Sequence, residues 1–138
     1  EIVAEGPTVI LDGAHNAAGA AALKRALGGF KYRRLILVLG ILADKDWRGM
    51  IRRLAPLAHR VILTRPPEER ALAPEALAAE AMRWSGSVDA VNEPREAIRK
   101  ALEAAGRDDL VCVAGSLYLV GAVRHLFISS KGSGFGGK

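Results

Sequence analysis

Short apolar runs alternate along the chain with longer segments whose apolar residues recur every three or four positions. The runs are rich in Val, Ile and Leu, which is typical of strands buried on both faces of a sheet. The longer segments have the spacing of amphipathic helices. Five such run-and-segment cycles follow one another, so the pattern predicts alternating strands and helices.

The expected strands are residues 8–11, 34–40, 60–64, 87–91 and 109–115. The expected helices are residues 16–27, 46–57, 73–84, 93–105 and 116–127. Asn16 is a good N-cap residue, and Pro74 and Pro94 suit first helical turns. Pro56 marks the end of the second helix or a kink in it.

This order of elements predicts an α/β fold with a mostly parallel β-sheet, helices on both faces and right-handed crossovers. We expect one domain over residues 1–128, because a chain of this length with 50% hydrophobic residues can bury a single core. Residues 129–138 are rich in Gly and Ser and are expected to form a flexible tail.

Ligands of parallel sheets bind beyond the carboxyl ends of the strands. Four loops of this sequence fall there: "DGAHN" at 12–16, "GILADKDW" at 40–47, "TRPPEER" at 64–70 and "AGS" at 114–116. These loops are therefore the first places to look for site residues.

The first loop carries Asp12, His15 and Asn16. The free N–H groups and the dipole at the following helix start favour a phosphate or a carboxylate. His15 could add a donor there, and Asp12 could hold a ribose hydroxyl or a metal-bound water. The alternative is an ordinary turn in which Asn16 is only a cap, since Asp, Gly, Asn and His are all common in turns.

The other loops offer Lys45, Thr64, Arg70 and Ser116. Lys45 could neutralise phosphate charge or belong to a solvated cluster, and Arg70 could bind a carboxylate bidentately, although Arg65 competes for that role. Ser116 taken alone is more typical of a helix cap. The G-x-S-x-G pattern of a hydrolase nucleophile is missing around it, so the sequence does not favour nucleophilic catalysis.

Composition narrows the function classes. The net charge is +5, but the basic residues are scattered and aromatic residues make up only 5%, which argues against nucleic-acid binding. The single cysteine, Cys112, allows no internal disulfide or zinc set and suits a reducing cytoplasm. No apolar run approaches the roughly 20 residues of a membrane span, so no membrane partner is expected.

Read in order, "LDGAHN", "GILADKD", "TRPPEERALAPEALA" and "DLVCVAGSLYLVGAVR" resemble motifs of the carboxy-terminal domain of folylpolyglutamate and dihydrofolate synthases. These enzymes are members of the ATP-dependent Mur ligase superfamily. The resemblance runs from about Pro7 to Arg124, and it departs at Ala17, where the family usually has proline. It implies the Rossmann-like fold of that domain.

The resemblance also implies a reaction: ATP phosphorylates a pteroate or folate carboxylate, and the amino group of L-glutamate then attacks the acyl phosphate. Asp12, His15 and Asn16 would contact ATP, with Asp12 and His15 taking catalytic roles. His15 would also lie beside the incoming glutamate, which Ser116 would help to hold. Three more residues match positions of the family's motifs and are candidate site residues to which we assign no role: Lys45, Thr64 and Arg70.

In this family the P-loop, the magnesium ligands and most of the folate site lie in a preceding domain, and this sequence contains none of them. We therefore expect the second domain of a monomeric two-domain ligase, inactive when isolated, with no metal site of its own. Its expected ligands are ATP with Mg²⁺, L-glutamate, and dihydropteroate or a reduced folate. The alternative is a stand-alone nucleotide- or protein-binding module; a nucleic-acid-binding domain would instead show affinity that falls steeply with salt.

Overall fold

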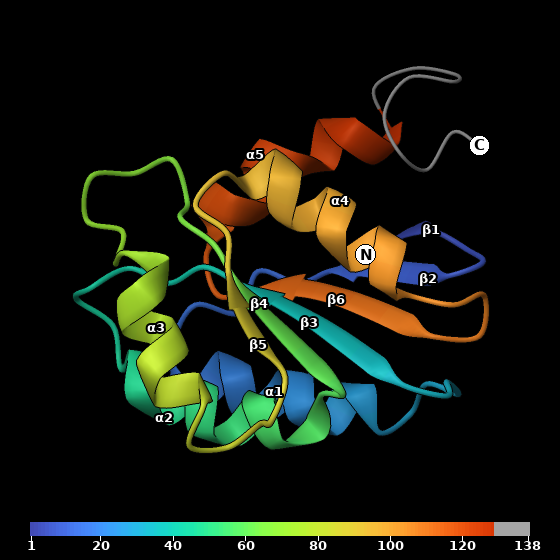
Figure 1. Cartoon of the computed structure of the whole chain (residues 1–138), viewed down its shortest axis with the longest axis horizontal. Helices are drawn as coiled ribbons and strands as arrows, with labels where there is room; N and C mark the ends of the chain where they lie inside the picture. Colours follow the sequence, from blue (N-terminus) through green and yellow to red (C-terminus); the bar gives the residue numbers. More distant parts are fainter. Residues whose placement is uncertain (129–138) are drawn as a thin grey trace.

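A six-stranded sheet forms the centre of the structure, a computed structural model that describes residues 1–128 (Figure 1). The strands are β1 (Ile2–Ala4), β2 (Thr8–Leu11), β3 (Leu35–Leu39), β4 (Arg60–Leu63), β5 (Val88–Ala90) and β6 (Leu110–Ala114). The helices are α1 (Ala17–Leu27), α2 (Trp47–Leu54), α3 (Pro74–Ala81), α4 (Pro94–Ala104) and α5 (Leu117–Ile128), with a 3₁₀ turn η1 (Ala55–Leu57) after α2. The tail expected at 129–138 lies outside the described residues.

The five predicted strands and five predicted helices are all present, with ends shifted by a few residues. Helix α2 ends at Leu54 and tightens into η1, because Pro56 has no N–H to continue the α-helical ladder. The sequence analysis missed β1, which pairs antiparallel with the outer side of β2. The other pairings are parallel, so the predicted mostly parallel sheet is confirmed.

The two faces of the sheet carry separate hydrophobic clusters, and different helices cover each face (Figure 1). Leu35, Leu37 and Leu39 of β3 point to the side covered by α1, α2 and α3. The intervening Ile36 and Val38 point to the side covered by α4 and α5. Because both faces are covered, all five β3 residues are buried, which explains why this strand reads as a continuous apolar run. Within the described part of the chain, no helix is long and apolar enough to cross a bilayer.

Strand order brings the first and last parts of the chain together. The sheet runs β1-β2-β6-β3-β4-β5, so β6 fills the position between β2 and β3. Cys112 in β6 is in register with Ile10 on one side and with Leu37 on the other. The carboxyl ends of β2, β6 and β3 are therefore neighbours at one edge of the sheet, which is the geometry of a ligand-binding switch point.

The central position of Cys112 makes its thiol inert. Burial, with a smaller contribution from the Asp12 charge, raises the pKa of Cys112 to about 12. At pH 8 roughly one thiol in ten thousand would then be a thiolate, the form that attacks disulfide reagents. We expect no labelling of the native chain by a thiol reagent over minutes, and one label per chain after unfolding in guanidinium. Equal labelling rates in both states would contradict this burial.

Candidate functional site

The loops that follow β2, β3 and β6 are joined to one another by backbone hydrogen bonds. The Gly115 N–H donates to the Ala14 carbonyl at 2.9 Å, and the Gly40 N–H donates to the Ala114 carbonyl at 3.3 Å. Three loops that are distant in sequence are thus held in fixed relative positions at the carboxyl edge of the sheet.

Two glycines allow this close approach. Gly115 has a φ of +109°, and a Cβ atom there would lie 2.6 Å from the Gly40 carbonyl oxygen. A Cβ atom on Gly40 would lie 2.8 Å from Cδ of Pro66, which belongs to the loop after β4. Since a side chain at either position would clash, glycine allows the loops after β3, β4 and β6 to come into close contact at these two points.

Between these loops lies a small cavity of about 200 Å³, which we call the edge cavity. Four of the predicted site residues line it: His15, Lys45, Arg70 and Ser116. The remaining lining residues, which the sequence analysis did not select, are Leu42, Leu117 and Tyr118. The structure therefore brings together candidates from all four loops.

A second hollow of about 470 Å³ lies beside the start of α1, and Asp12, His15 and Asn16 are among its lining residues. His15 lines both spaces, so it stands where the hollow and the edge cavity adjoin. This is the position that a residue needs if it is to contact two ligands at once.

The loop before α1 is shaped by its own polar side chains. Asp12 Oδ1 accepts the Ala14 N–H at 2.9 Å, and Asn16 Oδ1 accepts the Gly19 N–H at 2.7 Å, so the predicted N-cap is confirmed. His15 Nδ1 lies 2.9 Å from the Gly13 carbonyl, to which it donates as Nδ1–H. This bond fixes the tautomer of the neutral ring and leaves Nε2 as a proton acceptor.

Ser116 is only 1% exposed and caps α5. Its Oγ accepts the N–H groups of Tyr118 at 2.9 Å and of Leu119 at 3.3 Å, as the cap interpretation requires. The hydroxyl proton remains available to donate to a ligand in the edge cavity. Leu117 and Tyr118 beside it are 62% and 48% exposed, which gives the cavity an apolar rim.

The cationic side of the edge cavity is formed by Lys45 and Arg70. The Arg70 guanidinium binds the carboxylates of Glu68 and Asp44. The hydrogen bond from Arg70 lowers the pKa of Glu68, and the same bond raises the pKa of Arg70. Both groups are therefore charged at neutral pH.

Thr64 does not join this group. It is fully buried at the end of β4, and its Oγ1 donates to the Asn92 carbonyl at 3.3 Å. Neither the edge cavity nor the hollow beside α1 is lined by it. The described residues also contain no group of three or more His, Cys, Asp or Glu side chains arranged to hold a metal ion.

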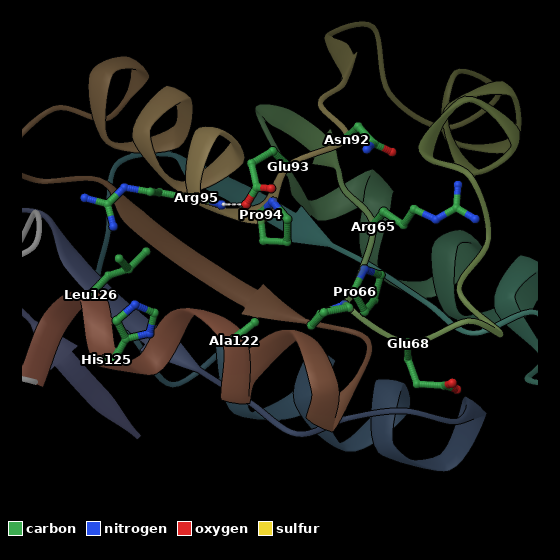
Figure 2. A pocket seen from close by; sticks show the side chains of 11 residues that line it. Arg65, Pro66, Glu68, Asn92, Glu93, Pro94, Arg95, Ala122, His125 and Leu126 are labelled. Atoms are coloured by element: carbon green, nitrogen blue, oxygen red, sulfur yellow. Dashed lines mark hydrogen bonds between the residues drawn. The ribbon is translucent and has the colours of Figure 1, made fainter.

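A third cavity, of about 510 Å³, lies between the start of α4, helix α5 and the loop after β4 (Figure 2). Its arginines, Arg65 and Arg95, extend their guanidinium groups in opposite directions, so the cations do not converge (Figure 2). None of the predicted site residues lines it. The edge cavity and the adjoining hollow are therefore the better candidates for a ligand site.

Comparison with known proteins identifies the family to which the chain is similar. Residues 1–117 match the family model described as "Mur ligase, glutamate ligase domain". The chain is 37% identical over 137 residues to the dihydrofolate synthase/folylpolyglutamate synthase of Mycobacterium tuberculosis, covering 88% of this chain and 28% of that protein. It is 36% identical over 125 residues to a probable bifunctional folylpolyglutamate synthase/dihydropteroate synthase of Halobacterium salinarum, covering 90% of this chain and 15% of that protein.

Solved structures agree. Mycobacterium tuberculosis folylpolyglutamate synthase complexed with ADP and AMPPCP matches with a TM-score of 0.85 and 36% identity, over 93% of this chain and 31% of that one. A bifunctional folylpolyglutamate synthase/dihydrofolate synthase with Mn, AMPPNP and L-glutamate bound matches with a TM-score of 0.82 and 28% identity, over 89% of this chain and 29% of that one. The chain thus spans less than a third of the length of each of these relatives.

Proposed function

Because this chain belongs to the Mur ligase family as a glutamate ligase domain, we propose that it helps an ATP-dependent ligase to add L-glutamate to dihydropteroate or a folate. The domain would act with a P-loop domain, facing it with the edge that carries the four loops. Relatives named as folylpolyglutamate and dihydrofolate synthases, and a related structure holding a nucleotide and L-glutamate, support this proposal. A stand-alone binding module is the less favoured alternative.

The observation that carries the proposal is the set of groups in the edge cavity. Lys45 and Arg70 are cations, Ser116 keeps a hydroxyl donor, and His15 presents Nε2. L-Glutamate carries two carboxylates and an amino group that must lose protons before and during attack. The cavity thus offers a complement for each polar part of this amino acid.

The proposed roles follow the reaction. The glutamate amine attacks the carbonyl carbon of the acyl phosphate, the C–N bond forms, the C–O bond to phosphate breaks and inorganic phosphate leaves. His15 Nε2 accepts the proton that the amine releases, since its other nitrogen is committed to Gly13. Ser116 and the two cations hold the glutamate in position for this attack.

The hollow beside α1 is the proposed nucleotide side of the domain. Asp12 uses Oδ1 to fix its own loop, so its other oxygen can accept a ribose hydroxyl, and the Asn16 amide can donate to a phosphate. Mg²⁺ would neutralise phosphate charge when bound. We assign its ligands to the P-loop domain.

We propose a monomeric enzyme in the cytoplasm, with dihydropteroate or a reduced folate as the acceptor. Which acceptor is used depends on a folate pocket that we assign to the P-loop domain.

A ligation assay tests the proposal. The chain, joined to its P-loop domain, is incubated with ATP, Mg²⁺, L-glutamate and dihydropteroate or tetrahydrofolate, and the glutamylated product is measured. We expect product from the joined protein and none from the chain alone. We further expect His15→Ala and Ser116→Ala each to lower kcat/KM for glutamate by roughly 10- to 100-fold, because each removes a group aimed at the reacting ligands.

His125→Ala is the matched control, since His125 is exposed on α5 and lines neither the edge cavity nor the hollow. It should leave the rate unchanged. Failure of the joined protein to make product would overturn the proposal and favour the binding module. Full activity of both site variants would reduce His15 and Ser116 to structural residues.

A further inference from the structure

Two loops of the site are tied together by backbone pairing. The segment around Ala71, after β4, runs antiparallel to the segment around Leu42, after β3, with a bridge between these two residues. Next to the bridge, the Ala43 N–H donates to the Arg70 carbonyl at 2.8 Å. The start of the Arg70 side chain is therefore fixed beside the loop that carries Asp44.

The far end of the same side chain is fixed as well. Arg70 Nε donates to Glu68, and Nη1 donates to Oδ2 of Asp44 at 3.1 Å. Glu68 also accepts the backbone N–H of Arg70 at 3.4 Å, so one carboxylate contacts both the main chain and the side chain of the arginine. We call these three residues, Asp44, Glu68 and Arg70, the arginine clamp. Among the described residues, the third guanidinium nitrogen, Nη2, has no hydrogen bond.

The position of the Glu68 side chain favours its bonds to Arg70. Its side chain is only 15% exposed, although it lies on an outer loop. Its carboxylate points away from the other residues of the third cavity (Figure 2). An arginine without such ties would lose rotamer freedom on binding a ligand, and this loss weakens binding. Two ties already in place avoid that cost.

The order of the strands sets the direction of a bound amino acid. His15 and Ser116 follow β2 and β6, which are adjacent, whereas Arg70 follows β4, two strands away from β6. An amino group near His15 thus places the far end of the amino acid toward Arg70.

We infer that Asp44 and Glu68 are positioning residues that aim Arg70 at the side-chain carboxylate of an acidic amino acid in the edge cavity. The inference rests on the proposed function and adds the residues that select glutamate over uncharged amino acids. A neutral amide at this position would still offer a carbonyl oxygen to Arg70 but would lose the negative charge that strengthens the bond, so an uncharged amino acid should bind less tightly than glutamate.

The test uses the joined ligase and compares five variants. Glu68→Ala and Asp44→Ala remove one tie each, while Glu68→Gln and Asp44→Asn keep an acceptor oxygen. Glu69→Ala, on the exposed neighbouring residue, removes a carboxylate of the same loop from outside the clamp. KM and kcat for L-glutamate, KM for ATP, and the rate ratio of L-glutamate to L-glutamine are measured for each.

We expect each alanine variant of the clamp to raise KM for L-glutamate roughly tenfold and to lower the glutamate-to-glutamine ratio, with kcat and KM for ATP within about twofold of wild type. The amide variants should recover most of the loss, and Glu69→Ala should behave as wild type. Unchanged KM in both alanine variants would overturn the inference alone. So would equal rises in KM for glutamate and ATP, which would indicate a structural role. Lack of ligation by the unmodified enzyme would overturn the proposed function and the inference together.

Discussion

Gly115→Ala is expected to lower the free energy of unfolding by about 3 kcal/mol or more. A residue with a side chain is strained at a φ of +109°, which costs on the order of 1–3 kcal/mol by itself. The new Cβ would also lie 2.6 Å from the Gly40 carbonyl oxygen and 3.0 Å from Cγ1 of Ile41. Backbone cannot give way as a flexible side chain can, so the loops after β3 and β6 must separate. Urea unfolding followed by circular dichroism measures the loss.

The matched control is Gly121→Ala, because a Cβ on Gly121 in α5 would meet no atom within 4 Å. Alanine favours a helix over glycine, so this variant should be stabilised by up to about 1 kcal/mol. In the joined ligase, Gly115→Ala should also reduce turnover, since Ser116 moves with its neighbour. A Gly115→Ala protein as stable as wild type would contradict the tight crossing of the loops.

Asp109→Ala should destabilise the fold by about 3 kcal/mol. Asp109 directly precedes β6, at the amino ends of the parallel strands and away from the edge cavity. Asp109 is 2% exposed, and its Oδ2 accepts the Gly106 N–H at 2.7 Å and Arg34 Nη2 at 3.3 Å. Removing one partner of a buried ion pair typically costs 3–5 kcal/mol. We expect a loss of about 3 kcal/mol, at the lower end of this range, for two reasons. Asp109 Oδ1 and Arg34 Nε are buried without hydrogen-bond partners among the described residues, so the pair is not ideal. The Arg34 side chain is also one-third exposed, which weakens the pair.

The same carboxylate should make stability depend on pH. Burial alone would raise the pKa of Asp109, but the bonds from Gly106 and Arg34, with the charges of Arg34 and Arg33, bring it below its ordinary 3.8. The contribution of Asp109 to the free energy of unfolding is therefore complete above the ordinary pKa of 3.8. It is lost as the pH falls through the lower pKa that Asp109 has in the folded state. Urea unfolding at pH 7 and in steps below pH 4 should show wild type and Asp109→Ala converging in acid. Exposed Asp108→Ala is the control, and an equal loss in both variants at pH 7 would rule out a special role for Asp109.

Much of the fold was predictable because the buried strands of a parallel sheet are covered on both sides. Strand β3 reads as an unbroken apolar run for this reason. Strand β1 was not predictable, because it has only three residues and is the outermost strand of the sheet. Its pairing with β2 also has an irregular register between Ile2 and Ala4. A segment that short has no measurable alternation of exposed and buried positions.

The candidate site was predictable to the extent that it follows from topology. The rule that ligands bind beyond parallel strands placed His15, Lys45, Arg70 and Ser116 in candidate loops, and the structure brings them to one cavity. The rule could not separate these residues from Thr64, whose hydroxyl is used inside the protein. The arginine clamp was not predictable as a unit, because Asp44 meets Glu68 and Arg70 only through the pairing of the irregular loops after β3 and β4.

The position of β6 in the sheet also determines the order in which the strands can pair during folding. Within residues 1–128, the last strand in sequence, β6, lies inside the sheet, and it is the one parallel partner of β2, about one hundred residues later. On a ribosome, β2 and α1 would emerge well before β6 but could not join β3 until residues 110–114 had been made. Such distant pairing slows folding. The candidate site depends on the same late event, because the loop with Ser116 reaches the loop with His15 only when β6 has paired with β2.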